Sequence, residues 1–321
     1  MQDKDLNLVT LATLFVDEDK ARAFLEAKRW PHGPVCPFCQ STAVYTLTPK
    51  AGSTKPVRAG VYKCKACRKQ FTVRIGTIFE DSHIPLSKWL MAIHLMTSSK
   101  KGISSHQLAR ELGITIKSAW FLSHRVREAM REAPMADLLC GTVEVDETYV
   151  GGNPRASRGK PTKTGRGTDK QPVVVLMSRD GWVRSMPIPR VDGATLKQAI
   201  REYVDSSATI MTDELRSYQG IGREFAGGHF TVTHNHGEFV RRVNDGTDFV
   251  STSTAESYAA LLKRGHYGIS HHFSKKHLSR YCDEFSFRWN YRKVSDGERM
   301  VAAIQGVEGK RLMYGELHRT V

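Results

Sequence analysis

The sequence lacks any long apolar run and any secretory leader. The two absences argue against a membrane-spanning protein and against a secreted one. Its longest clean apolar stretch, Val173–Met177, has five residues, whereas a membrane-spanning helix needs ~18. The first residues, Met1–Asp5, carry neither the basic nor the apolar segment of a secretory signal. Because 40% of the residues are hydrophobic, the chain can bury real cores. We therefore expect a soluble cytoplasmic protein without a membrane partner.

Acidic residues are scarce relative to basic ones. The 321 residues include 48 Lys and Arg against 33 Asp and Glu, which gives a formal net charge of +15. Residues 1–135 hold 21 basic and 11 acidic residues, so two-thirds of the net charge lies in the first two-fifths of the chain. Such an excess favours a polyanionic partner, nucleic acid first and an acidic membrane surface second.

Cysteine is also rare, but four of the six cysteines form two matching pairs. Cys36 and Cys39 are separated by two residues, as are Cys64 and Cys67, and 24 residues lie between the pairs. Each pair can aim two thiolates at one ion, and two pairs complete a tetrahedral Zn²⁺ site. Strand-like segments at 43–47 and 57–62, joined through a polar turn at 51–54, predict a zinc ribbon within residues 31–80.

Two other uses of these cysteines are less suitable. Two disulfides would require an oxidising compartment, and a redox motif would explain one pair but not both. The remaining Cys140 and Cys282 lie far apart in the sequence, and we expect both to be ordinary buried thiols.

Helical spacing of apolar residues surrounds the ribbon. It predicts helices over 7–15 and 19–28, within an N-terminal helical region of residues 1–30, and another helix over 85–96. Ser104–Trp120 then has the order of a helix-turn-helix, in a DNA-binding region of residues 81–135. A plain helical hairpin that acts as a spacer is the alternative. The second helix would offer DNA these side chains: Thr115, Lys117, Ser118, His124 and Arg125.

After Gly141 the periodicity becomes that of strands. Side chains alternate along Thr142–Asp146, so Glu144 and Asp146 share one face and Glu147 points away from Asp146 if the strand continues. A second apolar strand, over 208–213, ends in Asp213. Two such strands can bring both carboxylates to one sheet edge, where divalent cations would offset their repulsion. Either aspartate alone could equally be a turn or cap residue.

A helix over 254–265 supplies a third carboxylate. Glu256 lies near its start, and Lys263, seven residues later, lies two turns on along the same face, followed by Arg264. One face of this helix thus offers an acid for a metal ion and a base for a phosphate. The helix dipole alone would favour the same charge arrangement, which is the simpler interpretation.

Taken together, these residues make the chain resemble the zinc-ribbon insertion-sequence transposases of bacteria, a group of DDE transposases. The resemblance runs from about residue 7 to about residue 300. It implies a multidomain α+β and α/β protein, with the zinc ribbon and helix-turn-helix first. A ribonuclease H-like mixed sheet flanked by helices would follow over 136–305, and then a C-terminal tail over 306–321. The motifs that carry the resemblance are Arg29–Pro31, Cys36–Cys39, Tyr62–Cys64, Phe71–Glu80, Val145–Gly152, Thr212–Glu214, His234–Glu238 and Leu261–Gly265.

The resemblance implies an enzyme that cleaves and joins DNA. It would bind the terminal inverted repeats of a mobile element, cut the element ends and join the freed 3′-OH to target DNA. Such an enzyme works in the bacterial cytoplasm, associated with the nucleoid, as a homodimer or larger assembly on DNA. Asp146, Asp213 and Glu256 would be its catalytic residues and would hold two Mg²⁺ or Mn²⁺ ions.

The third catalytic position departs from the family pattern. Family members often have asparagine three residues before the glutamate, where this chain has Ser253, and a serine is a poor metal ligand. We therefore assign the third role to Glu256. Glu238, near His234 and His236, is a rival carboxylate, or else part of a structural His/Glu cluster that lines the site.

A basic segment at 153–171 separates the first two aspartates. It is rich in glycine and contains two prolines, and we expect a loop that becomes ordered on DNA phosphates. A solvated run of charges is the alternative. The expected phosphate contacts are Arg155, Arg158, Lys160, Lys163 and Arg166, together with Lys263 and Arg264.

Two further functions fit parts of this pattern. A zinc-ribbon DNA-binding regulator could carry an inactive nuclease-like domain, although the intact carboxylate trio argues against it. A ribonuclease H-like nuclease that hydrolyses DNA without strand transfer would share every carboxylate. The products formed from a pre-cut DNA end would distinguish the three.

Overall fold

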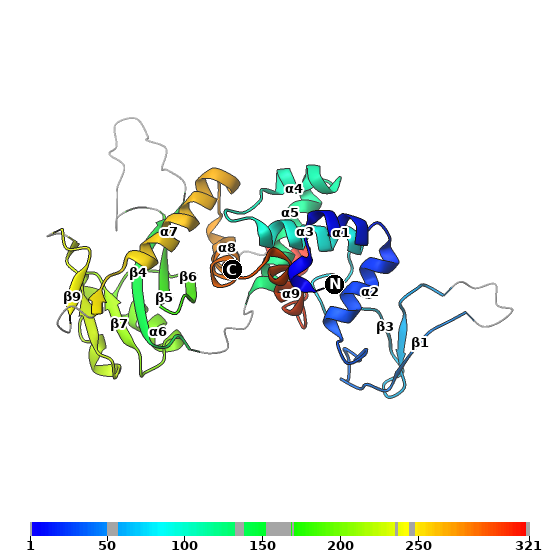
Figure 1. Cartoon of the computed structure of the whole chain (residues 1–321), viewed down its shortest axis with the longest axis horizontal. Coiled ribbons are helices and arrows are strands. Elements are labelled where there is room, and N and C mark those ends of the chain that lie inside the picture. The colour runs from blue at the N-terminus through cyan, green and yellow to red at the C-terminus, as the bar shows by residue number, and fades with distance from the viewer. Residues whose placement is uncertain are drawn as a thin grey trace. The chain divides into compact units, whose positions relative to one another are not determined.

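The computed structural model describes residues 2–49, 57–131, 138–151, 168, 170–234, 237–243 and 248–318. The chain divides into two compact units (Figure 1): residues 1–133 with 294–319, and residues 134–293. The expected catalytic domain of 136–305 and C-terminal tail of 306–321 differ from this division, because residues after 293 pack in the first unit. In the part of the chain that is described, no helix is both long and apolar enough to cross a membrane.

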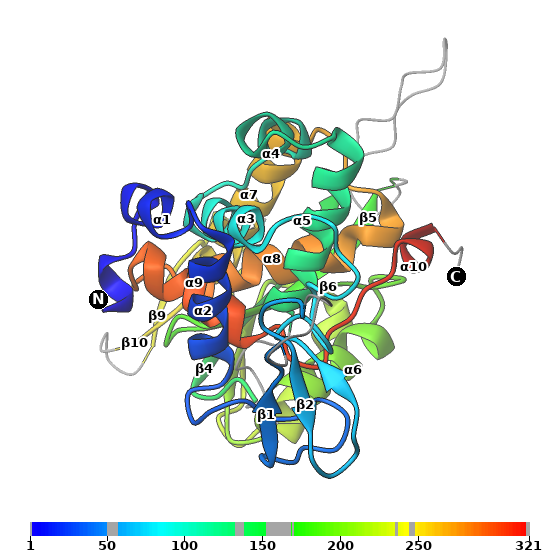
Figure 2. The same cartoon turned by 90° about the vertical axis from the view of Figure 1, so that its right-hand side faces the viewer.

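The first unit is built around α3 (Leu86–Ser98), whose Trp89, Leu90 and Ile93 are almost fully buried. Because apolar residues occur on nearly all its sides, α3 packs against several helices at once (Figure 2). These are α1 (Leu8–Leu14), α2 (Glu18–Arg29), α4 (Ser105–Leu112), α5 (Ile116–Met130) and α9 (Asp296–Gln305). A short helix, α10 (Tyr314–His318), follows α9.

The zinc ribbon is a three-stranded antiparallel sheet in the order β1 (Val44–Thr46), β2 (Tyr62–Cys64) and β3 (Gln70–Phe71). The strand expected at 57–62 begins only at Tyr62, and the turn expected at 51–54 lies outside the described residues. Trp30, which follows α2, meets the rings of Tyr62 and Phe71 edge-on, with centroids 5.6 and 6.0 Å away. These aromatic contacts fix the sheet to α2.

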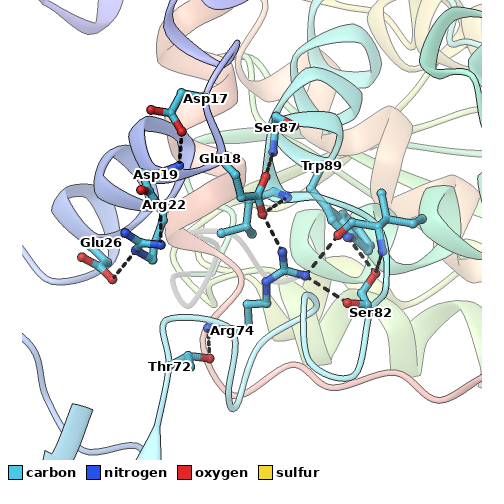
Figure 3. A network of polar contacts seen from close by, with 12 residues as sticks. Asp17, Glu18, Asp19, Arg22, Glu26, Thr72, Arg74, Ser82, Ser87 and Trp89 are labelled. Carbon is cyan, nitrogen blue, oxygen red and sulfur yellow. Dashed lines mark hydrogen bonds and ion pairs between the residues drawn. The ribbon is translucent and has the colours of Figure 1, made fainter. Parts of the chain in front are cut away.

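A polar network joins the ribbon to the helices (Figure 3). The carboxylate of Glu18 accepts the backbone N–H groups of Leu86 and Ser87 at 2.8 and 3.2 Å, and so caps α3 from outside that helix. Arg74 donates to the same carboxylate at 2.9 Å and to the carbonyl oxygens of Ser82 and Ile84. One carboxylate therefore connects α2, the segment after the ribbon and the first turn of α3.

The predicted helix-turn-helix is formed by α4 and α5. Gly113 ends α4 in the left-handed conformation, with φ 59°, which a glycine adopts without steric cost. Thr115 then caps α5, because its side chain accepts the backbone N–H of Ser118.

The second unit contains a five-stranded sheet in the order β6-β5-β4-β7-β8. The strands β4, β5 and β6 are antiparallel, whereas β7 and β8 run parallel to β4. Helices cover both faces of this mixed sheet, as the fold expectation requires (Figure 1). The strands are β4 (Thr142–Val150), β5 (Gln171–Ser178), β6 (Val183–Pro187), β7 (Thr209–Thr212) and β8 (His229–Thr231).

The two faces have separate cores. Alternation sends Val143 and Val145 toward α6 (Gly193–Tyr203), and Val173 and Val175 toward the opposite helices, α7 and α8. Helix α7 spans Ser253–Gly265 and α8 spans Leu278–Asn290. A hairpin of β9 (Arg241–Val243) and β10 (Asp248–Val250) lies in the chain between β8 and α7. Shorter helical turns are η1 (Asp3–Asp5), η3 (Arg216–Tyr218), η4 (Ile221–Glu224), η7 (His266–Ser270) and η8 (Lys275–His277).

Candidate metal sites

The four paired cysteines come together in the ribbon. Their Sγ atoms all lie within 4.8 Å of one another, and the Cys36–Cys67 and Cys39–Cys64 separations are both 3.6 Å. A tetrahedron of bonds about 2.3 Å long has sulfur atoms about 3.8 Å apart, whereas a disulfide requires about 2.05 Å. The donor set therefore fits one Zn²⁺ ion.

Both cysteine pairs sit in the same kind of turn. Gln40 donates its backbone N–H to the carbonyl of Cys36 at 2.9 Å, and Arg68 donates to that of Cys64 at 3.1 Å. Gln40 and Arg68 occupy equivalent positions and have φ angles of 60° and 63°. The backbone N–H of Cys67, aided by that of Ala66, lowers the pKa of Cys64 to about 6. That thiol is thus available as a thiolate at neutral pH.

The second unit brings Asp146 and Asp213 side by side. In the parallel register of β4 and β7, Glu144 lies opposite Met211, so two residues further on Asp213 follows β7 beside Asp146. Glu256 lies in the first turn of α7, which covers the same face of the sheet. Asp146 and Asp213 are half-buried and Glu256 is exposed.

The charge of these carboxylates is concentrated. Burial first, and then repulsion from Glu147, Asp213 and Glu256 in that order, raise the pKa of Asp146 to about 7. Carboxylate oxygens are hard ligands, and a divalent cation would offset both the burial and the repulsion. Among the described residues, the four cysteines are the group of three or more ligand side chains whose ligand atoms lie close enough together to hold a metal ion, so the binding of Mg²⁺ or Mn²⁺ at the carboxylates stays a prediction.

Glu147 lies on the opposite side of β4, as alternation predicts, because the strand continues to Val150. Its carboxylate accepts the hydroxyl of Tyr218 at 2.7 Å. Burial and the nearby Glu147 raise the pKa of Tyr218 well above its ordinary value, so the hydroxyl stays a donor. The backbone N–H of Glu147 also donates to Oδ1 of Asp146 at 2.8 Å, which orients that carboxylate.

Sequence reasoning missed the role of Glu144, whose side chain is 1% exposed. Its Oε2 accepts the backbone N–H groups of Thr254 and Ala255 at 2.9 and 3.1 Å. Its Oε1 is 3.4 Å from Nε of Arg179, which also donates to the carbonyl of Phe249 at 2.8 Å. Glu144 therefore attaches the start of α7 to β4. Strand alternation places Glu144 on the same face as Asp146, and this was the one sign in the sequence of a role for Glu144. Its partners Thr254 and Ala255 lie 110 and 111 residues away, so the pattern could not identify them.

The rival carboxylate, Glu238, has a local role. Its Oε2 accepts the backbone N–H of Thr233 at 3.1 Å. The next residue, His234, donates its own backbone N–H to Glu214 at 2.9 Å, and its Nδ1 lies 3.6 Å from Oε1 of Glu256. His236 lies outside the described residues.

Ser253, at the position where asparagine was expected, is engaged locally. Its hydroxyl accepts that of Ser251 at 2.7 Å, and its backbone N–H donates back to Ser251 at 3.0 Å. This pair shapes the turn that enters α7.

The residues expected to meet DNA have different exposures. Lys117 is exposed, and its Nζ lies 4.9 Å from the centre of the Tyr314 ring. Arg125 and His124, which we expect to face DNA, are buried, with 4% and 0% exposure. Arg125 donates to the carbonyl of Glu80 at 2.5 Å, and burial lowers its pKa to about 10. Residues Leu122–Arg127 of α5 are buried. The sequence pattern up to Trp120, on which the helix-turn-helix prediction rested, does not include them.

On α7, Lys263 is half-buried and Arg264 is exposed. The other expected phosphate contacts lie outside the described residues: Arg155, Arg158, Lys160, Lys163 and Arg166. Three apolar side chains of α8 belong to the hydrophobic core of the second unit. Leu278, Tyr281 and Phe285 are buried against α7 and the sheet.

Comparison with known proteins gives matches to both units. Residues 138–290 match the family model of an ISXO2-like transposase domain, and residues 16–70 match that of a transposase zinc-ribbon domain. The chain is 32% identical over 289 residues to an "Uncharacterized protein in transposable element ISH50" of Halobacterium salinarum. That alignment covers 85% of this chain and 91% of the relative.

Solved structures of Mos1 complexes are similar at a much lower level. A pre-cleavage Mos1 transpososome shares 15% identity, with 65% of this chain and 75% of that chain covered and a TM-score of 0.26. A Mos1 strand transfer complex shares 13% identity over 70% and 79% of the two chains, also with a TM-score of 0.26. The sequence matches alone therefore define the family.

Proposed function

Because the chain belongs to the ISXO2-like transposase family, we propose that it is a DNA transposase that cuts the ends of a mobile element and joins them to target DNA. The observation that carries this proposal is the proximity of Asp146, Asp213 and Glu256: burial first, and then repulsion from Glu147, Asp213 and Glu256, raises the pKa of Asp146. Three carboxylates contributed by a strand, a strand end and a helix start are suited to two divalent cations. When bound, Mg²⁺ or Mn²⁺ would lower the pKa of the attacking oxygen and stabilise the leaving one.

The proposed reaction conserves phosphodiester bonds in its second step. In cleavage, a water oxygen bonds to phosphorus, the P–O3′ bond breaks and the 3′ oxygen takes up a proton. In joining, that 3′-OH attacks a target phosphate and a target 3′ oxygen leaves. Asp146 and Asp213 would hold the cations, Glu256 would complete the site, and Lys263 and Arg264 would bind flanking phosphates.

The first unit would recognise the terminal inverted repeats. Support comes from the exposed, basic Lys117 at the start of α5, and from the concentration of positive charge in residues 1–135. The basic segment at 153–171 would add phosphate contacts, and joining two element ends would require at least a dimer on DNA. Zinc would maintain the ribbon.

The test is a strand-transfer assay with the full chain, Mn²⁺ or Mg²⁺, a pre-cut end bearing the element's own terminal repeat, and supercoiled plasmid. We expect the wild type to produce joined molecules and Asp146→Asn and Asp213→Asn to produce none. Hydrolysed ends without joining would indicate a nuclease, and full activity in either variant would refute the active-site assignment.

The same assay distinguishes the candidates for the third position. Glu256→Gln should abolish joining, whereas Ser253→Ala should retain most of it. The reverse result would move the third role to Ser253. Glu238→Gln serves as the matched control, because this substitution keeps an oxygen that can accept the N–H of Thr233.

A further inference from the structure

Next to the carboxylates, the start of the β9–β10 hairpin exposes an aromatic side chain. Phe239 is 59% exposed and Val240 is 54% exposed, although the two residues before them are held by hydrogen bonds. Glu238 accepts the N–H of Thr233, and Gly237 donates its N–H to the carbonyl of His234 at 2.9 Å with a φ of 75°. The position of Phe239 is therefore constrained by the backbone before it.

His234 is connected to both sides of the carboxylate site. Glu214, which directly follows Asp213, accepts the backbone N–H of His234 at 2.9 Å. On the other side, Nδ1 of His234 lies 3.6 Å from Oε1 of Glu256. One imidazole thus separates the Phe239 ring from the proposed third carboxylate.

The Phe239 ring contacts one imidazole and is otherwise largely exposed. Its centroid lies 5.3 Å from that of His234, and the two ring planes are tilted by 34°. With more than half of its surface exposed, Phe239 gains little from packing inside the protein. An exposed aromatic ring is a surface on which a nucleobase can stack.

The hairpin also carries the charge that a DNA strand requires. Arg241 and Arg242 follow Phe239 in β9, and Arg242 is exposed. Phe249, opposite Arg242 in the register, is 49% exposed, but the guanidinium of Arg179 lies 4.1 Å from its ring centre. The Phe249 ring is thus partly covered by Arg179. The Phe239 ring instead contacts His234, which lies next to Glu256.

We propose that Phe239 binds an unpaired base of single-stranded DNA immediately next to the phosphate held at the carboxylate site. Arg242 binds the backbone of the same strand. This proposal rests on the proposed function for the identity of the nearby phosphate, and it adds a binding site for an unstacked nucleobase. The site would therefore select single-stranded over duplex DNA, because a base in an intact duplex is already stacked on its neighbours and cannot stack on the Phe239 ring.

The test compares two probes on the full chain in Ca²⁺, a cation that permits binding to be measured without cleavage. One probe is a 30-base-pair duplex with a four-nucleotide single-stranded 3′ tail, and the other is the same duplex with blunt ends. We expect the wild type to prefer the tailed duplex, and Phe239→Ala to lose about tenfold of that preference, the scale of one base–aromatic stack. Affinity for the blunt duplex should stay unchanged.

Three matched variants separate stacking from packing. Phe239→Leu keeps an apolar side chain and should behave like the alanine variant, whereas Phe239→Trp should restore the preference. Phe249→Ala, on the opposite strand of the hairpin, should leave it unchanged. A 5-iododeoxyuridine in the tail should cross-link to Phe239 on irradiation. An unchanged tail preference in Phe239→Ala, or full retention in Phe239→Leu, would overturn the proposal.

A strand-transfer assay of the wild type keeps the two proposals distinguishable. If the wild type joins DNA ends and Phe239→Ala keeps its tail preference, only the nucleobase site is refuted. If the wild type binds tailed DNA through Phe239 but joins no ends, the proposed function fails and the binding site remains.

Discussion

Replacing Asp146 with asparagine should make the metal-free protein more stable while abolishing its proposed chemistry. In the folded chain the pKa of Asp146 is about 7, against an ordinary value of 3.8, because the carboxylate is buried among Glu147, Asp213 and Glu256. Asparagine keeps an oxygen that can accept the N–H of Glu147, which Oδ1 of Asp146 accepts at 2.8 Å. The substitution therefore removes the repelled charge and retains the hydrogen bond.

The direction and size of the change in stability follow from the linkage between the ionisation of Asp146 and folding. A carboxyl group whose folded pKa is raised destabilises the fold only where it ionises, so the cost is absent below about pH 4 and complete above about pH 7. The difference in pKa corresponds to about 4 kcal/mol at most. For a domain of this size that amounts to roughly 10 °C in melting temperature. The gain in Asp146→Asn should thus grow steadily as the pH rises from 4 to 8.

The measurement is thermal unfolding of the full chain from pH 4 to 8, without added Mg²⁺ or Mn²⁺ and without chelators that would remove zinc. Adding Mn²⁺ should then stabilise the wild type more than the variant. Asp205→Asn is a control of opposite sign, because hydrogen bonds from Ser207 lower the pKa of Asp205, so any loss of stability should shrink as the pH falls. If Asp146→Asn melted no higher than the wild type at pH 8, the argument from carboxylate repulsion would be refuted.

Four further substitutions test other parts of the structure. Cys64→Ser should reduce bound zinc below one ion per chain by elemental analysis and make residues 31–80 sensitive to protease, whereas full zinc content would contradict the four-cysteine site. Glu144→Gln should cost about 1.5–3 kcal/mol of unfolding free energy in urea, the value of hydrogen bonds to a buried charge. It should also weaken Mn²⁺ binding, because α7 and Glu256 lose their attachment to β4; unchanged Mn²⁺ affinity would argue against that role. Lys117→Ala should weaken DNA binding and lower its salt dependence by about one unit of slope, while Arg125→Met should lower stability and leave that slope unchanged. A lower slope in Arg125→Met would place the buried arginine on DNA.

Local patterns predicted the features whose cause is local. The cysteine spacing specified the metal site because each turn is completed within six residues, as the bonds from Gln40 to Cys36 and from Arg68 to Cys64 illustrate. Strand alternation correctly separated Glu147 from Asp146, because β4 stays regular through Val150. A period of two or 3.6 residues carries this information directly.

Features that depend on distant partners were not predictable in the same way. Glu144 looked like another strand carboxylate until its bonds to Thr254 and Ala255 were seen. Arg125 looked like a recognition-helix residue because nothing in its neighbourhood indicated that the carbonyl of Glu80 would bind it. Residues 294–305 were grouped with the preceding domain by sequence proximity, although their apolar face packs on α3.

The placement of α9 has a consequence for synthesis. The first unit needs Met300, Ala303 and Ile304, all 0% exposed, to complete its core, yet they are translated after the whole of residues 134–293. On the ribosome, the unit encoded first is therefore finished last, and the carboxylate-bearing sheet can fold while the ribbon-bearing unit still lacks a helix. A nascent chain would therefore acquire its proposed DNA-cutting centre before its proposed DNA-binding unit is stable.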